Sequence, residues 1–184
     1  NYIKYENKKG YLTEADIIAH NSFRKQILSL YPNDQVFSEE DAKKNFFQKI
    51  KSQFYWLIDP ICGTTNYIYG LPFYSHAITL FTGEKAVSAG VYDPTRKELF
   101  FSDGKNFYIN SEKITITNHI RLSEALVSLN TNQSQINNEH ETLSYIVNKF
   151  NPPITRRLHV LESANLELAY IAAGRLDAYY NPTD

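Results

Sequence analysis

A short, continuous apolar run constrains the fold of this chain more than any other feature. Residues 54–58 read Phe-Tyr-Trp-Leu-Ile and are followed at once by Asp59 and Pro60. An unbroken apolar run of this length is typical of a strand buried on both faces, so we expect a central strand that ends at Asp59. A glycine and two threonines follow at positions 63–65, and this pattern favours a tight turn into a helix. The segment therefore predicts a strand, a loop and a helix start of an α/β fold.

The rest of the chain alternates between helical and strand patterns. Thr13, followed three residues later by Asp16, forms a capping-box pattern at the start of a helix predicted over residues 14–30. The residues before it are expected to form an ordered arm or a frayed end. Further expected elements are a strand at 36–38, a helix or turn-rich insertion at 42–51, an antiparallel meander over 74–116, a strand at 125–129, helices at 138–150 and 163–173, and a strand at 176–180. This order predicts two lobes, an α+β lobe over residues 1–120 and the start of an α/β lobe over 121–184.

Charge and composition exclude several classes of protein. The 184 residues carry 19 Lys+Arg and 20 Asp+Glu, a net charge of −1, which removes the main electrostatic reason to expect nucleic acid or an anionic membrane as partner. No apolar run approaches the roughly 20 residues of a membrane helix. The single cysteine, Cys62, cannot form an internal disulfide and fits a reducing cytoplasm. A preference for Lys over Arg, with many Asn, Ile and Tyr, favours a low-GC bacterium as source.

Acidic side chains at two predicted strand ends point to a divalent cation site. Asp59 follows the apolar strand, and Glu39 and Glu40 follow the strand at 36–38. A carboxylate at the end of a buried strand is partly desolvated, so it requires a cation or hydrogen-bond donors. Carboxylates that meet at one sheet edge can hold hard cations such as Mg²⁺. The alternative is that Glu39 and Glu40 are solvated surface residues and that Asp59 only forms a turn.

Gly63 and Thr64 add the elements of an anion site next to these acids. Glycine permits close approach of the backbone, and the first N–H groups of a helix can point at a bound phosphate. A capped helix start without a ligand is the alternative interpretation.

Taken together, these segments resemble the inositol monophosphatase family in order and spacing. The segments that carry the resemblance are residues 12–16 (LTEAD), 37–40 (FSEE), 56–66 (WLIDPICGTTN), 70–73 (GLPF), 90–94 (GVYDP) and 172–180 (AAGRLDAYY). The resemblance implies a layered α/β/α/β/α sandwich of the inositol monophosphatase and fructose bisphosphatase type, with a second lobe that is incomplete at the C-terminus. It also implies Mg²⁺-dependent hydrolysis of a small phosphate monoester, such as inositol monophosphate or a related sugar or nucleotide phosphate, by a cytoplasmic homodimer.

The resemblance also assigns roles to individual residues. It implies that Glu39, Asp59, the Ile61 carbonyl and position 62 bind two or three Mg²⁺ ions, with Glu39 also catalytic. It implies that Asp16 and Thr64 orient and deprotonate the attacking water and that the N–H groups of Gly63 and Thr64 bind phosphate. Glu40 is expected to contact the metal ligands rather than the metal. Phosphoryl transfer needs charge neutralisation and in-line positioning, which is the chemistry that such a set of ligands supplies.

Cys62 is the main departure from the family pattern, which has an aspartate at this position. A thiol is a soft ligand that favours zinc or Cu(I) over Mg²⁺. Three explanations compete: a catalytically weak or inactive relative, a site for a softer metal, or an introduced or erroneous residue. A cysteine phosphatase is disfavoured, because the phosphate-binding arginine expected shortly after such a nucleophile is replaced by Ile68.

Other departures lie near the substrate pocket implied by the resemblance. Glu162, Ser163 and Ala164 stand where the family has a small Gly-Ser-Ala-like run, so a carboxylate at position 162 is expected to crowd a polyol or repel a phosphate-rich ligand. Asn181 stands where many inositol-active members carry an acid. Two functions therefore remain open: a metal-dependent phosphatase, impaired by Cys62, and an inactive member that binds a phosphorylated ligand or serves as a dimer scaffold.

Overall fold

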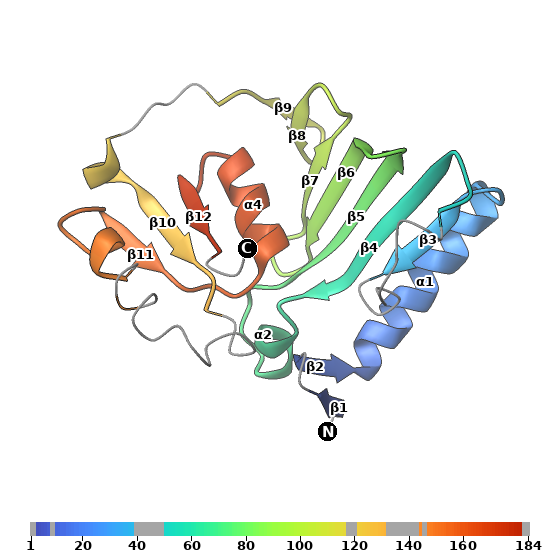
Figure 1. The fold of residues 1–184 in the computed structure, drawn as a ribbon, viewed down its shortest axis with the longest axis horizontal. Coiled ribbons are helices and arrows are strands. Elements are labelled where there is room, and N and C mark those ends of the chain that lie inside the picture. Colours follow the sequence, from blue (N-terminus) through green and yellow to red (C-terminus); the bar gives the residue numbers. More distant parts are fainter. Residues whose placement is uncertain are drawn as a thin grey trace.

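The strands form a two-stranded hairpin and two larger sheets (Figure 1). The computed structural model describes residues 3–7, 10–38, 50–116, 121–131, 144 and 147–181. The seven-stranded sheet has the order β3-β4-β5-β6-β7-β8-β9, and the three-stranded sheet has the order β11-β10-β12. The elements are β1 (Ile3–Asn7), β2 (Gly10–Thr13), α1 (Glu14–Leu30), β3 (Gln35–Ser38), β4 (Phe54–Cys62), α2 (Thr64–Ile68), β5 (Ser75–Thr82), β6 (Lys85–Asp93), β7 (Glu98–Ser102), β8 (Phe107–Ile109), β9 (Glu112–Ile114), η3 (Leu122–Glu124), β10 (Leu126–Leu129), β11 (Arg157–His159), α4 (Ala164–Ala172) and β12 (Ala178–Tyr180).

Helix α1 has the bounds predicted from the sequence. Thr13 and Asp16 form the expected capping box, in which the Asp16 N–H donates to Thr13 Oγ1 over 3.3 Å and the Thr13 N–H donates to Asp16 Oδ2 over 2.7 Å. The helix packs on the seven-stranded sheet through a core that includes Ile27, Val36 and Ile58. The cap and this apolar contact together fix the helix against β3 and β4.

The central strand β4 differs from its prediction in length. It is parallel to β3 and antiparallel to β5, as a central strand should be, but it continues through Asp59 and Pro60 to Cys62. The register with β5 is irregular between Asp59 and Cys62, and such an irregularity accommodates a proline that cannot donate to the ladder. The prediction that the strand ends at Asp59 was therefore wrong. Burial on both faces is confirmed in the middle of the strand, since Tyr55 and Ile58 point to opposite faces and are 1% and 3% exposed, whereas Phe54 at its start is 37% exposed.

The predicted antiparallel meander is confirmed as the series β5 to β9. Its turns use residues suited to them. Gly104, for example, has a φ of +81°, and a Cβ at this position would lie 2.6 Å from the Val87 carbonyl oxygen. A side chain would therefore be excluded there by both the backbone conformation and the available space.

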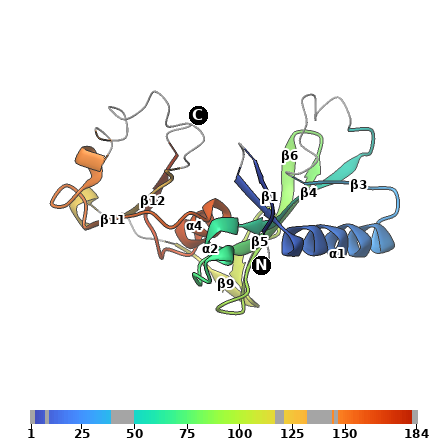
Figure 2. The same ribbon diagram turned by 90° about the horizontal axis from the view of Figure 1, so that it is seen from below.

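Helices α1 and α4 cover opposite faces of the seven-stranded sheet. Residues that pair directly across neighbouring strands lie on the same face of the sheet. Ile78 packs against the core under α1 and pairs with Gly90, which pairs with Phe101, so all three lie on the α1 face. Phe100 therefore faces the other side, where it is 2% exposed and packs against α4 residues Leu166 and Tyr170. Figure 1 shows α4 between the two larger sheets, and Figure 2 shows α1 beyond the other side of the sheet.

The described chain thus has the layers of the expected sandwich, and its mixed α/β class is confirmed. Residues 147–150 are helical, and Phe150 contacts Tyr180 of β12 with ring centroids 5.9 Å apart, so an outer helix contacts the three-stranded sheet. The rest of the helix predicted over 138–150, and most of the insertion predicted over 42–51, lie outside the described residues. The hairpin β1-β2 and strand β11 were not predicted. The division into lobes at residue 120 stays a prediction.

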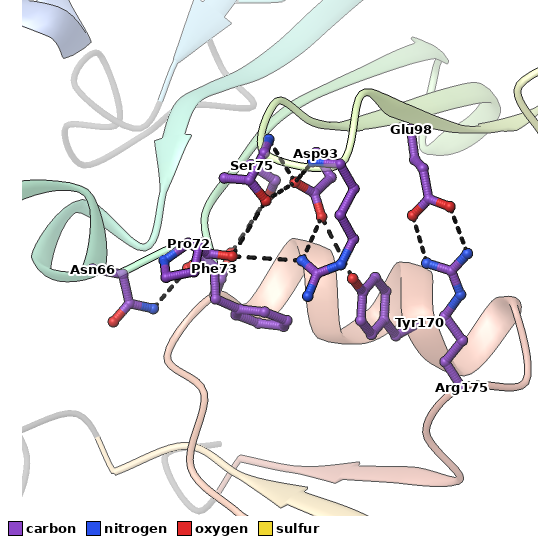
Figure 3. A network of polar contacts seen from close by, with 11 residues as sticks. Asn66, Pro72, Phe73, Ser75, Asp93, Glu98, Tyr170 and Arg175 are labelled. Carbon is purple, nitrogen blue, oxygen red and sulfur yellow. Dashed lines mark hydrogen bonds and ion pairs between the residues drawn. The ribbon is translucent and has the colours of Figure 1, made fainter. Parts of the chain in front are cut away.

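Two sets of polar contacts, one around buried Asp93 and one partly exposed, join α4 to the seven-stranded sheet (Figure 3). Asp93 is fully buried and accepts hydrogen bonds from the N–H groups of Thr95 and Arg96, from the Arg96 guanidinium over 3.1 Å, and from the Tyr170 hydroxyl over 3.4 Å. Arg175, just after α4, forms two hydrogen bonds of 2.6 and 2.7 Å with the Glu98 carboxylate. These contacts set the position of α4, whose N-terminal end meets the end of β4.

In the part of the chain that the structure describes, no helix has the length and apolar character needed to cross a bilayer.

Candidate functional site at the end of strand β4

The Asp59 carboxylate lies at the bulged end of β4 and contacts the first turn of α4. The side-chain amide of Asn165 donates a hydrogen bond from Nδ2 to Asp59 Oδ2 over 2.7 Å. These residues are 106 positions apart in the sequence, so the contact depends on the docking of α4. The last part of β4 thus brings a carboxylate to the junction of the two sheets, a position that the sequence did not predict.

Cys62 lies in the same junction, with its side chain turned toward α4. The Asn165 N–H donates to Cys62 Sγ over 3.3 Å, and the Ser163 hydroxyl donates to the Cys62 carbonyl over 3.0 Å. Burial, together with the negative charge of Asp59, raises the pKa of the Cys62 thiol to about 12. Without a bound metal ion this shift favours the neutral thiol, which is a weaker nucleophile than a thiolate.

Gly63 and Thr64 form the start of the short helix α2, as predicted. Gly63 has a φ of +90°, and a Cβ at this position would lie 3.1 Å from both the Glu162 carbonyl oxygen and Ser163 Cβ. Only glycine fits this left-handed conformation and this close approach. The Thr64 hydroxyl donates to the Ile61 carbonyl over 3.0 Å, so it fixes the loop between the strand and the helix. A helix start leaves its first N–H groups without partners inside the helix, and such groups can bind an anion.

Asp16 is buried, with 3% of its surface exposed, and it forms hydrogen bonds with Thr13 in the cap of its own helix. Its Oδ2 atom accepts hydrogen bonds from both the N–H and the hydroxyl of Thr13, over 2.7 and 2.5 Å. Among the described residues, this cap accounts for the hydrogen bonds of the Asp16 carboxylate. The pairing of Asp16 with Thr64 around a water molecule therefore stays a prediction.

The remaining predicted residues divide into two groups. Glu39 and Glu40 lie outside the described residues. Glu162 is exposed at the rim of the junction, in a left-handed conformation with a φ of +61°, and its carboxylate accepts a hydrogen bond from the Thr131 hydroxyl over 2.9 Å. Asn181 is farther along the chain and accepts a contact of 3.5 Å from the Asn130 amide.

Ser163 and Ala164 begin α4 at the centre of the junction. Ser163 is the N-cap residue and is fully buried, but its hydroxyl bonds Cys62 rather than capping the helix. Its N–H donates to Glu167 Oε2 over 3.1 Å, and Glu167 is itself 1% exposed. Burial raises the pKa of Glu167, although hydrogen bonds from Ser128 and Ser163 oppose that effect. This buried acid therefore holds the first turn of α4 in place.

The sequence did not identify Asn165 and Glu167 as parts of the site. Both lie in the first turn of a predicted helix, and Ser163 and Ala164 immediately before them were recognised. The available signal was the helical spacing, which places Ser163 and Glu167 one turn apart on the same face. What the spacing could not show was that this turn docks on the end of β4.

The described donor atoms fit a divalent cation only in part. The Asp59 carboxylate and the Ile61 carbonyl are hard oxygen donors of the kind that Mg²⁺ prefers, whereas the Cys62 thiol is not. Within the described ranges, no group of three or more His, Cys, Asp or Glu side chains is placed to hold a metal ion. The Asp59 carboxylate and the Ile61 carbonyl thus match a hard cation in donor type, and the described residues do not supply the full set of ligands that the resemblance implies.

Comparison with known proteins gives a consistent result. A family model described as the inositol monophosphatase family matches residues 3–183. The Nus factor SuhB of Pseudomonas aeruginosa is 30% identical over 183 residues, which cover 97% of this chain and 66% of that protein. The fructose-1,6-bisphosphatase/inositol-1-monophosphatase of Thermotoga maritima is 30% identical over 192 residues, covering 97% of this chain and 68% of that protein.

Solved structures show the same fold. The extragenic suppressor protein suhB from Bartonella henselae matches with a TM-score of 0.85 at 23% identity, over 97% of this chain and 68% of that chain. An IMPase/NADP phosphatase complexed with Mg²⁺ and phosphate matches with a TM-score of 0.78 at 19% identity, over 98% of this chain and 65% of that one. The chain spans 63–66% of the length of the first three curated relatives it matches.

Proposed function

Because this chain belongs to the inositol monophosphatase family, we propose that it binds a small phosphate monoester at the end of β4 and hydrolyses it slowly with Mg²⁺. The substrate class is an inositol monophosphate or a related sugar or nucleotide phosphate. The observation that carries the proposal is that one short segment brings the Asp59 carboxylate, the Ile61 carbonyl and the start of α2 to the same edge of the sheet.

Each residue of this segment has a proposed role. The N–H groups of Gly63 and Thr64 bind the phosphate, and glycine is required because the backbone approaches Glu162 and Ser163 closely. The Thr64 hydroxyl donates to Ile61, so its oxygen lone pairs can accept a hydrogen bond from the attacking water. Asp16 is proposed as the base that takes the proton from this water.

The metal-binding residues proposed are Asp59, Ile61 and Glu39, with Glu40 supporting them. When bound, Mg²⁺ supplies charge neutralisation on the phosphate and activates a water molecule. Cys62 replaces a carboxylate of the family pattern with a soft sulfur, and we propose that this substitution keeps both cation affinity and rate low.

Phosphate release from a panel of monoesters tests this proposal. The protein is assayed with inositol 1-phosphate, a sugar phosphate and a nucleotide 3′-phosphate across a Mg²⁺ titration, with Asp59→Asn as the matched variant of the same shape. We expect slow release that depends on Mg²⁺ and is lost in Asp59→Asn. Equal rates in the two proteins, or no dependence on Mg²⁺, would contradict the proposal.

A second candidate function is the binding of a phosphorylated ligand without catalysis. The contact that favours it is the hydrogen bond from the Asn165 side-chain amide to Asp59 Oδ2 over 2.7 Å, because this donor occupies a carboxylate oxygen that a cation would otherwise contact. Two relatives in the comparison carry the name Nus factor SuhB, which is not the name of a phosphatase. Calorimetric binding of a monoester in the presence of EDTA, without phosphate release, is the result that this alternative predicts.

We further propose that the protein is a homodimer in a bacterial cytoplasm and that neither nucleic acid nor membranes bind it. The near-neutral net charge of −1 supports the absence of strong electrostatic partners. Light scattering coupled to size exclusion gives the oligomeric state directly, and a mass of one chain across the micromolar range would contradict the dimer.

A further inference from the structure

The first turn of α4 makes two contacts with the proposed metal-binding segment through a single residue. Asn165 donates from Nδ2 to Asp59 Oδ2 over 2.7 Å and from its backbone N–H to Cys62 Sγ over 3.3 Å. It therefore contacts both the carboxylate that the proposed function assigns to the cation and the residue that departs from the family pattern.

The position of Asn165 is fixed by its neighbours in the helix. Ser163 and Leu166 are both fully buried, and the Ser163 N–H is held by Glu167, which is 1% exposed. On the far side, Leu166 packs in the same cluster as Phe100 of the seven-stranded sheet. A side chain on so constrained a turn cannot leave the Asp59 carboxylate by a shift of the helix, only by rotation of its own bonds.

An amide N–H group and a cation compete for the same carboxylate oxygen. An N–H donor is attracted to Asp59 Oδ2 because its hydrogen carries partial positive charge, and the same hydrogen is repelled by a metal ion at that oxygen. A cation that approaches Oδ2 from the side of α4 must displace Nδ2. The energy of the hydrogen bond is then subtracted from the energy of cation binding.

We infer that Asn165 is a second determinant of cation affinity at this site, beside Cys62, and that its side-chain amide lowers the affinity for Mg²⁺ by holding Asp59 Oδ2. The inference rests on the proposed function, in which Asp59 is a cation ligand. Replacing Cys62 alone therefore leaves part of the affinity unrecovered, and the two positions act together because both contact the same segment.

Mg²⁺ binding measured by isothermal titration calorimetry, with no substrate present, tests the inference. The proteins compared are the wild type, Cys62→Asp, Asn165→Ala and the double variant. We expect the double variant to bind Mg²⁺ about tenfold more tightly than Cys62→Asp, the factor corresponding to loss of one competing hydrogen bond to a charged group. Thermal melting without Mg²⁺ reports whether each variant is folded, and Asn165→Ser repeats the test if the alanine variant is not.

A matched control lies elsewhere in the chain. Asn106 also donates from its side-chain amide to an aspartate, Asp103, over 3.1 Å, but in an exposed turn between β7 and β8. Asn106→Ala in the Cys62→Asp background removes a similar contact, and we expect no change in Mg²⁺ affinity.

Three results would overturn the inference. If the double variant binds Mg²⁺ no more tightly than Cys62→Asp, the amide does not compete. If it binds Mg²⁺ more weakly than Cys62→Asp, the Asn165 carbonyl oxygen is itself a ligand. No detectable binding by the double variant shows that Asp59 is not a cation site in this chain. Because the titration contains no substrate, failure of phosphate release contradicts the proposed function while leaving this measurement intact.

Discussion

Replacement of Asp93 by asparagine is the most informative perturbation of the fold. Asp93 is fully buried and accepts hydrogen bonds through both carboxylate oxygens, Oδ1 from Thr95 and the Arg96 N–H, and Oδ2 from the Arg96 guanidinium and Tyr170. An asparagine of the same shape must turn an NH₂ group toward one of these two sets of donors. At least two hydrogen bonds to the charged carboxylate are then lost, and the new NH₂ group faces the N–H or O–H donors that made them.

The expected cost is about 3 kcal/mol in the free energy of unfolding. A hydrogen bond to a charged group contributes about 1.5–3 kcal/mol, and a buried donor left without a partner costs about 1–3 kcal/mol. The Arg96 side chain is 47% exposed, so water can replace its lost hydrogen bond. The loss in the free energy of unfolding therefore stays near the lower end of the summed ranges. The Tyr170 hydroxyl is buried, so water cannot replace its hydrogen bond.

Urea denaturation followed by circular dichroism measures this cost at pH 7 and pH 3. Burial alone would raise the pKa of Asp93, but hydrogen bonds from Thr95 and Arg96 outweigh it and lower the pKa below its usual value of 3.8. Because the folded-state pKa is lowered, the stabilisation is present above about pH 4 and is lost as the pH falls through the folded pKa. The wild type should therefore lose more stability than Asp93→Asn on acidification. A cost below 1 kcal/mol at pH 7, or parallel acid profiles, would refute the reasoning.

Three further substitutions test separate parts of the structure. Leu166→Ala removes a fully buried side chain from the core under α4, so we expect a loss of about 2–5 kcal/mol by urea denaturation, and a loss below 1 kcal/mol would contradict the packing described. Gly63→Ala places a Cβ 3.1 Å from Ser163 Cβ at a φ of +90°, so calorimetry should show weakened phosphate binding together with a lower melting temperature. Glu162→Gly relieves a φ of +61°, so we expect a gain of about 0.5–1 kcal/mol in thermal unfolding, and a loss of stability would show that the contact with Thr131 matters more than the strain.

The parts of the fold set by local sequence were predictable. The capping box at Thr13 and Asp16 and the apolar spacing after it located α1 at its observed bounds, and the turn residues located the meander. The end of β4 was not predictable. Pro60 suggests a strand end, but an irregularity in the pairing with β5 accommodates it, and the strand continues to Cys62. The hairpin β1-β2 was missed although Ile3 to Glu6 alternates apolar and polar residues, because so short a run is hard to distinguish from the polar residues around it.

The site was predictable where one continuous segment forms it and not where it depends on docking. Asp59, Ile61, Cys62 and the helix start at Gly63 lie within a few residues of one another, so their common location follows from the order of the sequence. Asn165 is 106 positions from Asp59, and only the burial of α4 against the sheet brings the two together. No local pattern marks such a residue.

We propose that the end of β4 is a phosphatase site whose rate is limited by the residue at position 62. The most direct test of this claim is the Mg²⁺-dependent rate of phosphate release by Cys62→Asp, with Cys62→Ser as the control that removes the thiol without adding a carboxylate. We expect at least a tenfold rise in kcat/KM for the aspartate variant, which corresponds to about 1.4 kcal/mol of transition-state stabilisation, and no comparable rise for the serine variant. Equal rates for Cys62→Asp and the wild type at saturating Mg²⁺ would contradict the claim.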